Sequence, residues 1–437
     1  MRFYSTNNTN KKRTFVTLKD AVLRGLAPDG GLFMPQKIPR LPNNFFKKIQ
    51  TLSFQDISFI IAKSFLSPDI SENDLRKIID QAINFDAPLK KLSDDTFVLE
   101  LFNGPTAAFK DFGARFMARL MKHLMGNIKS KLIVLVATSG DTGSAVASGF
   151  LNIKGTQVVI LYPSGRISNL QEKLLTTMGN NTIALEIKGT FDDCQRLVKQ
   201  AFIDVELNKH LRLTSANSIN IARLLPQLFY YFYGWSQLKN YDKEVVISVP
   251  SGNFGNLTAG LIAKKMGLPI AKFIAATNIN DVFGEYLTTG TFRPRPSQPT
   301  ISNAMDVGHP SNLARILELY DHDVNKIRTD ISHARFTDAQ TKKAVFQVYK
   351  KYHYIMDPHA AVGYLGLTHY FKNHSGGRGI FLATAHPAKF SEITKKILKQ
   401  NLEIPKRLKI HLQRKKQSVV LSNEFATFKD FLLNLVF

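Results

Sequence analysis

The sequence predicts an α/β fold, because short apolar runs repeatedly lead into a small polar loop and then into a helical stretch. In the first case the β-branched run 132–137 is followed by the glycine loop 138–143 and by a small-residue helix at 144–151. A second apolar run at 157–162 then completes a strand–helix–strand unit, whose crossover we expect to be right-handed.

The same pattern recurs in the second half of the chain. A strand is expected at 245–249, a loop at 250–256, a helix at 257–266 and the next strand at 272–276. Because neither glycine loop ends in Gly-Lys-Ser/Thr, and neither has the order Gly-x-Gly-x-x-Gly, the sequence predicts neither a P-loop nor a dinucleotide fingerprint.

A third, weaker case is the strand expected at 379–384, which ends at Ala385-His386-Pro387 before another helical stretch. Ligands of open α/β sheets bind beyond the carboxyl ends of the strands, so the three loops are expected to converge on one crevice. The loop at 251–255 suits a phosphate, because its glycines allow close backbone approach at a helix start. A tight turn without a ligand is the alternative for any single glycine loop.

Lys110 is the candidate nucleophile or base of this crevice. It follows the turn at 104–106 and stands beside Phe109 at the start of a stretch with helical apolar spacing. Apolar neighbours desolvate a lysine and favour its neutral, reactive amine. The alternative is a solvated lysine on a helix face, which is the usual state of a lysine.

Three regions are expected. Residues 1–95 form a mostly helical N-terminal region, and 96–240 form an α/β domain with Lys110 and the 138–143 loop. Residues 241–437 form an α/β domain with the 251–255 loop and C-terminal helices. These boundaries are approximate, and the domains can interleave.

The composition is that of a globular protein, with 44% hydrophobic and 21% charged residues in 437. No apolar run reaches about 18 residues, which argues against a membrane-spanning helix. The single cysteine, Cys194, excludes an intrachain disulfide and a multi-cysteine metal site. His309, His359 and His386 share no metal-binding spacing, so no metal is expected. The start of the chain lacks the apolar core of a signal peptide, and we expect a cytoplasmic protein.

The net charge of +24 needs an explanation. The basic residues are scattered, and their densest stretch, between 395 and 416, lacks interleaved aromatic residues for base stacking. We therefore interpret most of them as solvated surface that could help to attract an anionic substrate. Weak binding of a polyanion is the alternative.

Seven segments match motifs of one enzyme family in the same order along the chain. They are 27–35, 104–112, 137–143, 215–220, 250–255, 303–307 and 384–390. The chain thus resembles the threonine synthase family, whose members use pyridoxal 5'-phosphate and have the tryptophan-synthase β-subunit fold, fold type II. The resemblance implies two open domains with parallel or mixed sheets beside the helical N-terminal region. The last thirty or so residues match least well.

The resemblance also implies roles for the matched residues. Lys110 would carry the cofactor covalently and act as the catalytic base, while Thr384 would hydrogen-bond the pyridine nitrogen. The implied cofactor-binding residues are Lys110, Ser251, Gly252, Asn253, Phe254, Gly255 and Thr384. The implied substrate-binding residues are Thr138, Ser139, Asp141 and Thr142. Aspartate at position 141 is usual in threonine synthases, whereas related fold-type-II enzymes commonly have asparagine.

The implied reaction converts the small molecule O-phospho-L-homoserine and water into L-threonine and phosphate. Candidates to hold the substrate phosphate are Arg166, Ser168, Asn217 and Arg223. A serine or threonine dehydratase, or another β-replacement enzyme of this fold, would share Lys110 and both glycine loops. Alternatives of another class are an inactive cofactor-binding protein and a basic nucleic-acid binder. No membrane and no specific nucleic acid are expected as partners, and the chain could be a monomer or a homodimer.

Overall fold

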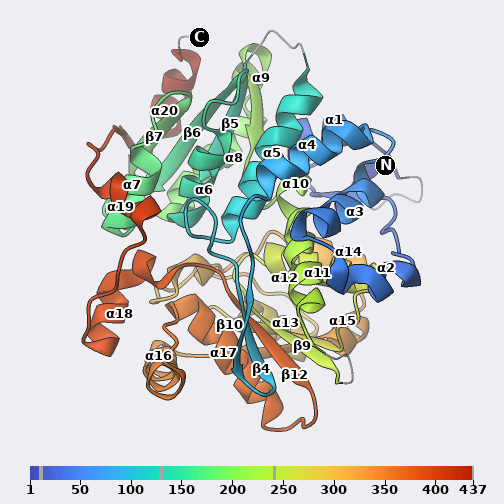
Figure 1. The fold of residues 1–437 in the computed structure, drawn as a ribbon. Helices are drawn as coiled ribbons and strands as arrows, with labels where there is room; N and C mark the ends of the chain where they lie inside the picture. Colours follow the sequence, from blue (N-terminus) through green and yellow to red (C-terminus); the bar gives the residue numbers. More distant parts are fainter. Residues whose placement is uncertain (9–12, 127–130, 240–242, 436–437) are drawn as a thin grey trace.

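The computed structural model describes residues 1–8, 13–126, 131–239 and 243–435. They form two α/β halves, one above the other in Figure 1, with the N-terminal helices along one side. The predicted α/β class is therefore confirmed, as are all five predicted strands to within one or two residues at their ends.

The lower half is built on a six-stranded sheet with the order β11-β10-β9-β12-β4-β3. Its strands are β3 (Leu89–Ser93), β4 (Thr96–Glu100), β9 (Val245–Pro250), β10 (Lys272–Thr277), β11 (Ile331–Arg335) and β12 (Arg378–Ala383). Strand β3 pairs antiparallel to β4, and all other neighbours are parallel, so the sheet is mixed. Its parallel strands end at the same edge, which faces the upper half (Figure 1).

The upper half holds a parallel five-stranded sheet with the order β13-β7-β6-β5-β8. Its strands are β5 (Leu132–Ala137), β6 (Thr156–Pro163), β7 (Thr182–Lys188), β8 (Arg212–Ser215) and β13 (Val419–Ser422). Every residue of β5 is buried, which explains its continuous apolar run.

The first predicted strand–helix–strand unit is β5, α6 (Asp141–Phe150) and β6. The helix begins three residues before its predicted start at Ser144. The cause is local, because the Thr138 hydroxyl accepts hydrogen bonds from the N–H groups of Gly140 and Gly143, both at 2.9 Å. These bonds turn the chain directly from strand into helix.

The N-terminal region combines helices with a short antiparallel pair of strands. Its elements are β1 (Phe3–Ser5), α1 (Leu18–Arg24), β2 (Phe33–Pro35), α2 (Asn43–Lys48), η1 (Ile49–Thr51), α3 (Phe54–Leu66) and α4 (Glu72–Ala82). Thr17, Ser53 and Ser71 cap the N-termini of α1, α3 and α4 through their hydroxyls.

The helices beyond residue 95 cover the two sheets and fill the space between them. Besides α6 they are α5 (Lys110–Met125), α7 (Asn169–Thr176), α8 (Phe191–Ile203), α9 (Val205–His210), α10 (Ile221–Leu224), α11 (Gln227–Ser236), α12 (Gly255–Lys265), α13 (Val282–Thr289), η2 (Asn303–Met305), α14 (Leu313–Leu319), α15 (Val324–Asp330), α16 (Asp338–Tyr352), α17 (Pro358–Phe371), η3 (Pro387–Phe390), α18 (Ser391–Leu398), α19 (Lys406–Leu412) and α20 (Phe425–Leu433). In the part of the chain that is described, none of them is long and apolar enough to cross a membrane.

The sheets interleave along the sequence. Strand β4 lies in the six-stranded sheet although it precedes Lys110, and β13 returns from the C-terminal end to the five-stranded sheet. Phe428 and Leu432 of α20 are buried with residues of β5, β7 and α8, so the tail belongs to the core. The predicted boundary between 240 and 241 lies outside the described residues, and the division into three regions stays a prediction.

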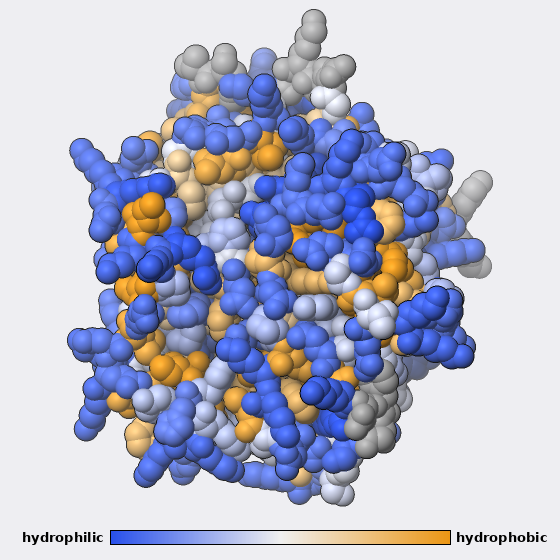
Figure 2. Space-filling model, viewed as in Figure 1, coloured by the Kyte–Doolittle hydropathy of each residue, from blue (hydrophilic) through white to orange (hydrophobic). Residues whose placement is uncertain are grey.

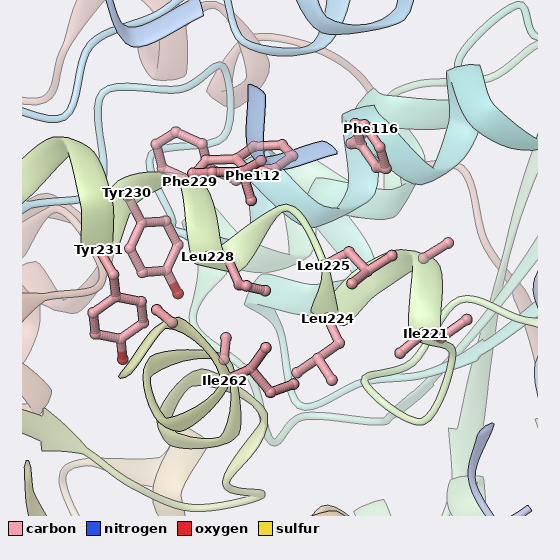
Figure 3. Close-up of a cluster of buried hydrophobic side chains, with 14 of the residues drawn as sticks. Phe112, Phe116, Ile221, Leu224, Leu225, Leu228, Phe229, Tyr230, Tyr231 and Ile262 are labelled. Carbon is pink, nitrogen blue, oxygen red and sulfur yellow. The ribbon is translucent and has the colours of Figure 1, made fainter. Parts of the chain in front are cut away.

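An aromatic core joins the two halves where α5, α11 and α12 meet. Figure 3 shows Phe112 and Phe116 of α5 near Phe229, Tyr230 and Tyr231 of α11, all of which are buried. The Tyr230 and Tyr231 hydroxyls both donate to the Asn256 side-chain oxygen at 2.7 Å. The aromatic stretch of α11 is thus core, and it fixes α12 relative to the helix that begins with Lys110.

Candidate functional site

The loops after β5, β9 and β12 open onto one cavity, as the sequence predicted. The cavity is lined by all the predicted site residues, namely Lys110, Thr138, Ser139, Asp141, Thr142, Ser251, Gly252, Asn253, Phe254, Gly255 and Thr384. Residues from both sheets thus meet between the halves, while the role of each residue stays a prediction.

Lys110 is the first residue of α5, and the chain before it is held to the end of β12. The Phe109 N–H donates to the Thr384 carbonyl at 2.8 Å, and Ala108 forms an isolated β-bridge with Ala385. The buried Asp111 carboxylate accepts bonds from the Thr106 N–H at 2.9 Å and hydroxyl at 2.7 Å. The turn before α5 therefore fixes where the lysine side chain leaves the backbone.

The Lys110 amine lies in the cavity wall beside one carboxylate. Its Nζ is 3.9 Å from Asp141 Oδ2 and 4.7 Å from the centre of the Phe109 ring, and 16% of the side chain is exposed. Burial lowers the pKa of Lys110, and the nearby cations Lys389 and Arg223 add to this, while the Asp141 carboxylate opposes it. The result is a lysine whose neutral amine is favoured, as a nucleophile or base requires.

Asp141 is buried at the start of α6 and has stronger partners than Lys110. Its Oδ1 lies 2.8 Å from the Lys389 Nζ and accepts a hydrogen bond from the Gln171 amide at 2.9 Å. Burial would raise the pKa of Asp141, but Lys389, Lys110 and the hydrogen bonds together lower it, so the side chain is a carboxylate. An anionic substrate would thus meet the hydroxyl and N–H groups of this loop rather than the Asp141 side chain.

Within the 138–142 loop the side chains divide into two groups. The Thr138 hydroxyl is buried and used to hold the loop, as described above. Ser139 and Thr142 are partly exposed and line the cavity. At the start of α6 the Gly143 N–H is bonded to the Thr138 hydroxyl, whereas the Asp141 and Thr142 N–H groups have no acceptor within the helix. The hydroxyls of Ser139 and Thr142 and these two N–H groups would therefore be the donors offered to a substrate carboxylate.

The 251–255 loop joins β9 to α12 and is held tightly by the chain itself. Phe254 has a left-handed backbone with φ of 59°. A Cβ at Gly252 would lie 2.8 Å from Met305 Cα and 3.0 Å from the Ala304 carbonyl oxygen, so only glycine fits there. The Ser251 hydroxyl donates to the Val249 carbonyl at 2.8 Å.

Asn253 is also committed to protein partners. Its amide donates to the Ser218 hydroxyl at 2.7 Å, and its side-chain oxygen accepts from the Ser311 N–H at 2.6 Å. The Asn312 amide donates to the Asn253 carbonyl at 3.1 Å. Behind it, the fully buried Arg315 guanidinium donates to Asn312 Oδ1 at 2.7 Å. Because its side chains are engaged in this way, the loop would offer a ligand mainly its backbone N–H groups.

Two of the four candidates for the substrate phosphate reach the cavity. Asn217 and Arg223 line it, whereas Arg166 is exposed and Ser168 caps α7, and neither of these lines the cavity. Both side-chain groups of Asn217 bond to the backbone of Ala137. Arg223 Nη1 donates to the Ala216 carbonyl, but the buried Arg223 Nε has no partner within the described residues.

His359 lines the cavity, and both of its ring nitrogens are engaged by the chain. His359 Nδ1 is 2.6 Å from Asp357 Oδ2, and its Nε2 accepts a bond from the Ala304 N–H at 3.1 Å. This pair attaches η2, which covers Gly252, to the start of α17. In the described ranges, no three His, Cys, Asp or Glu side chains gather to hold a metal ion.

Sequence reasoning assigned no role to several residues that shape the site, although two of them stand in matched motifs. Lys389 lies in the 384–390 segment, and Ser218 lies in the 215–220 segment. Gln171, Asn312 and Arg315 had no local signal, because their contacts join elements far apart in the sequence.

The residues present fit pyridoxal phosphate. A desolvated lysine amine suits its aldehyde, and a carboxylate-free loop at the start of α12 suits its phosphate. The tight contact of Gly252 with the η2 backbone leaves the loop rigid and close-packed on its protein side. Thr384, which directly follows β12, lines the same cavity, and its hydroxyl would be a neutral partner for a ring nitrogen.

Comparison with protein families gives three matches that together cover most of the chain. Residues 2–83 match a family described as threonine synthase N terminus, and 86–384 match the pyridoxal-phosphate dependent enzymes. Residues 360–432 match the threonine synthase C-terminal family. The C-terminal match includes most of the tail that the sequence motifs left unassigned.

Individual relatives are similar over their full length. The threonine synthase of Serratia marcescens is 44% identical over 436 residues, covering 100% of both chains. The crystal structure of threonine synthase from Escherichia coli superposes with a TM-score of 0.93 at 42% identity and covers 99% of this chain and 100% of that one. A structure of threonine synthase with bound PLP, from Brucella melitensis, gives a TM-score of 0.92 at 34% identity, covering 99% and 98%.

Proposed function

The chain belongs to the threonine synthase family, and on this premise we propose that it converts O-phospho-L-homoserine and water into L-threonine and phosphate with pyridoxal 5'-phosphate as its cofactor. The observation that carries the proposal is the placement of Lys110. Its desolvated amine opens into a cavity that also contains the 251–255 loop and the 138–142 loop.

The bound cofactor would supply an acceptor for the electron pair that remains when a proton leaves the substrate. Lys110 would hold the cofactor covalently through Nζ, and Thr384 would donate to or accept from the ring nitrogen. The backbone N–H groups of 252–255 would bind the cofactor phosphate at the helix start.

Lys110 would also move the proton at the substrate Cα. Burial favours its neutral amine, and its Nζ lies in the cavity wall 3.9 Å from Asp141 Oδ2. A neutral amine near the reacting carbon is a competent general base. The hydroxyls of Ser139 and Thr142, with the N–H groups of Asp141 and Thr142 at the start of α6, would orient the substrate carboxylate so that Cα faces Nζ.

Arg223 is the best candidate to hold the substrate phosphate. It lines the cavity, its Nε has no partner in the described part of the chain, and its guanidinium is packed against Gly113 of α5. Burial lowers the pKa of Arg223 to about 10, which still leaves it cationic at neutral pH. A buried cation with a free donor gains most from an incoming phosphate dianion.

The proposal is tested with the purified, cofactor-loaded protein. We expect a visible absorbance, an adduct that borohydride fixes at Lys110, and release of phosphate from O-phospho-L-homoserine with formation of L-threonine. Deamination of serine is measured in parallel, because a dehydratase of this fold would prefer it. Turnover of serine without turnover of O-phospho-L-homoserine would contradict the proposed reaction.

Two further expectations concern the location of the protein in the cell and its oligomeric state. A cytoplasmic location, and a monomeric or homodimeric state, stay predictions. Gel filtration with light scattering would establish the oligomeric state.

A further inference from the structure

The inference concerns the row of three largely buried ionisable side chains formed by Lys110, Asp141 and Lys389. One oxygen of Asp141 lies 2.8 Å from the Lys389 Nζ, and the other lies 3.9 Å from the Lys110 Nζ. The three side chains come from α5, α6 and η3, and each has at most 16% of its side chain exposed. A carboxylate therefore stands between two lysines in a site that excludes most water.

We propose that Lys389 is a positioning residue, which occupies the Asp141 carboxylate so that the Lys110 amine stays neutral and reactive. The proposal rests on the assignment of Lys110 as the cofactor lysine under the proposed function. Its basis is the unequal geometry of the two lysines around one carboxylate.

The charge balance of the row favours a neutral form for one of the lysines. Two protonated lysines and one carboxylate would leave a net positive charge in a buried site, which is costly. With one lysine neutral, the row has no net charge. The geometry decides which lysine loses its proton.

Lys389 contacts the Asp141 carboxylate much more closely than Lys110 does. Its Nζ has the short contact to Asp141 and a second acceptor in the Thr106 carbonyl, also at 2.8 Å. The Lys110 Nζ reaches Asp141 only at 3.9 Å, beyond hydrogen-bond distance. The geometry therefore favours the neutral form of Lys110, the lysine that opens into the cavity.

Lys389 is itself fixed from both sides. The Lys389 N–H donates to the His386 carbonyl at 3.0 Å, and the Lys389 carbonyl accepts from the Ser168 hydroxyl at 3.2 Å. On the other side, Gln171 holds Asp141 Oδ1 at 2.9 Å. The ion pair thus has a defined place between η3, α6 and α7.

Further charged groups act on Lys110 from the neighbouring elements. Arg223 of α10 lowers the pKa of the Lys110 amine, whereas Asp357, which caps α17, raises it weakly. Asp141 raises it more, and Lys389 lowers it. Removal of the Lys389 charge acts twice in one direction, because it withdraws a repelling cation and leaves Lys110 as the nearest cation to Asp141 within the described residues.

The test follows the capture of pyridoxal phosphate by the full-length chain after its cofactor has been removed. Capture joins the Lys110 Nζ to the aldehyde carbon and releases one water, and it needs the lone pair of a neutral amine. The rate is followed by visible absorbance between about pH 6 and 10, a range in which a lysine with a lowered pKa titrates. Borohydride fixation followed by peptide mapping identifies the lysine that has reacted. Because no substrate is present, an error in the proposed reaction would leave the result unchanged.

Lys389→Gln is the main variant, since an amide can still donate to the Thr106 carbonyl but carries no charge. Capture at neutral pH should fall about tenfold or more and recover as the pH rises, because each unit of upward pKa shift removes about nine-tenths of the neutral amine. Lys389→Arg should stay close to the parent chain. The double variant Lys389→Gln with Asp141→Asn removes both charges and should return capture at neutral pH to near the parent rate.

Lys264→Met is the matched control. Lys264 has the same two kinds of partner, the Asp330 carboxylate at 2.8 Å and the Ala271 carbonyl at 2.9 Å, but at the far end of α12. It should leave the capture profile unchanged. The same midpoint pH in Lys389→Gln as in the parent chain would overturn the proposal, and so would a double variant as slow at neutral pH as Lys389→Gln alone.

Discussion

The two walls of the cavity are built by opposite means. The wall with Lys110, Asp141 and Lys389 consists of ionisable side chains, and the Asp141 oxygens lie 2.8 Å from the Lys389 Nζ and 3.9 Å from the Lys110 Nζ. The wall at 251–255 has no charged residue, and its side chains bond to Ser218, to Ser311 and to the chain's own carbonyls. One wall thus presents groups that can gain or lose protons, and the other presents a rigid, uncharged backbone.

The difference shows how the site divides its tasks. A charged wall can change the protonation of one lysine through small differences in distance, because Coulomb interactions are strong where water is excluded. A neutral wall of fixed N–H groups can bind an anion without a counter-charge that would itself have to be titrated. The walls should therefore respond differently to substitution: the charged wall in rate and pH dependence, and the neutral wall in cofactor affinity.

The largest effect is expected from Lys110→Ala. The variant should still bind pyridoxal phosphate through the neutral wall, but borohydride should find no covalent link. The rate of phosphate release should fall by a factor of roughly a hundred to ten thousand or more, because the variant has lost its general base. Phosphate release assays and equilibrium dialysis of the cofactor measure the two effects. A near-normal rate, or an adduct on another lysine, would remove Lys110 from the mechanism.

The next largest effect is expected from Gly252→Val, on the neutral wall. Its Cβ would lie 2.8 Å from the Met305 backbone, so η2 must move, at a cost of about 1–3 kcal/mol of folding stability. Cofactor affinity should fall sharply, with the pH dependence of capture unchanged. Urea unfolding and cofactor titration separate these quantities. An unchanged affinity in a folded variant would contradict the phosphate assignment.

The sequence predicted the features of each wall that depend on neighbouring residues, and it missed those that depend on residues far apart in the chain. The strand–loop–helix pattern around 132–151 and 245–266 is local, so both loops could be found from spacing alone. Lys110 was selected by its apolar neighbours and the turn before it, together with these two loops. Strand β13 and the start of α6 were harder to predict from the sequence. The first pairs with β7, more than two hundred residues away, and the second depends on the bonds of the Thr138 hydroxyl.

The partners of the predicted residues could not be derived in the same way. Lys389 meets Asp141 only because η3 and α6 lie side by side in the fold, and nothing in its local sequence marks a buried ion pair. Likewise, Arg315 joins the Phe33 carbonyl of the N-terminal region to Asn312 behind the phosphate loop. Sequence patterns identify residues that face a site, whereas long-range packing decides what each of them is bonded to.

A smaller effect is expected from Gly255→Ala, which is the gentle counterpart of Gly252→Val. A Cβ at Gly255 would meet Asn312 and Ser218 at 3.4 Å, which the fold can accommodate with little adjustment. Alanine is also the better helix residue at this first position of α12, by up to about 1 kcal/mol. Stability without cofactor should thus be equal or higher, while cofactor affinity falls because the new methyl group hinders the approach of the phosphate. A parallel loss of both would instead indicate that the fold, and not the ligand, needs this glycine.

The smallest effect is expected from the basic residues of the surface, which are numerous but scattered, and it concerns the binding of nucleic acid. Hydrophilic residues are spread over the face shown in Figure 2. Within the densest basic stretch, 395–416, some residues are engaged by the rest of the fold. The Lys416 Nζ, for example, lies 2.6 Å from carboxylate oxygens of both Glu172 and Glu186. Exposed, scattered cations bind nucleic acid through phosphates alone, so affinity should be weak and should fall steeply with salt. Fluorescence anisotropy with labelled DNA and RNA at several salt concentrations measures this. A tight, sequence-selective complex at physiological salt would show that the surface charge is organised as a binding site, as the charges of the Lys110 wall are.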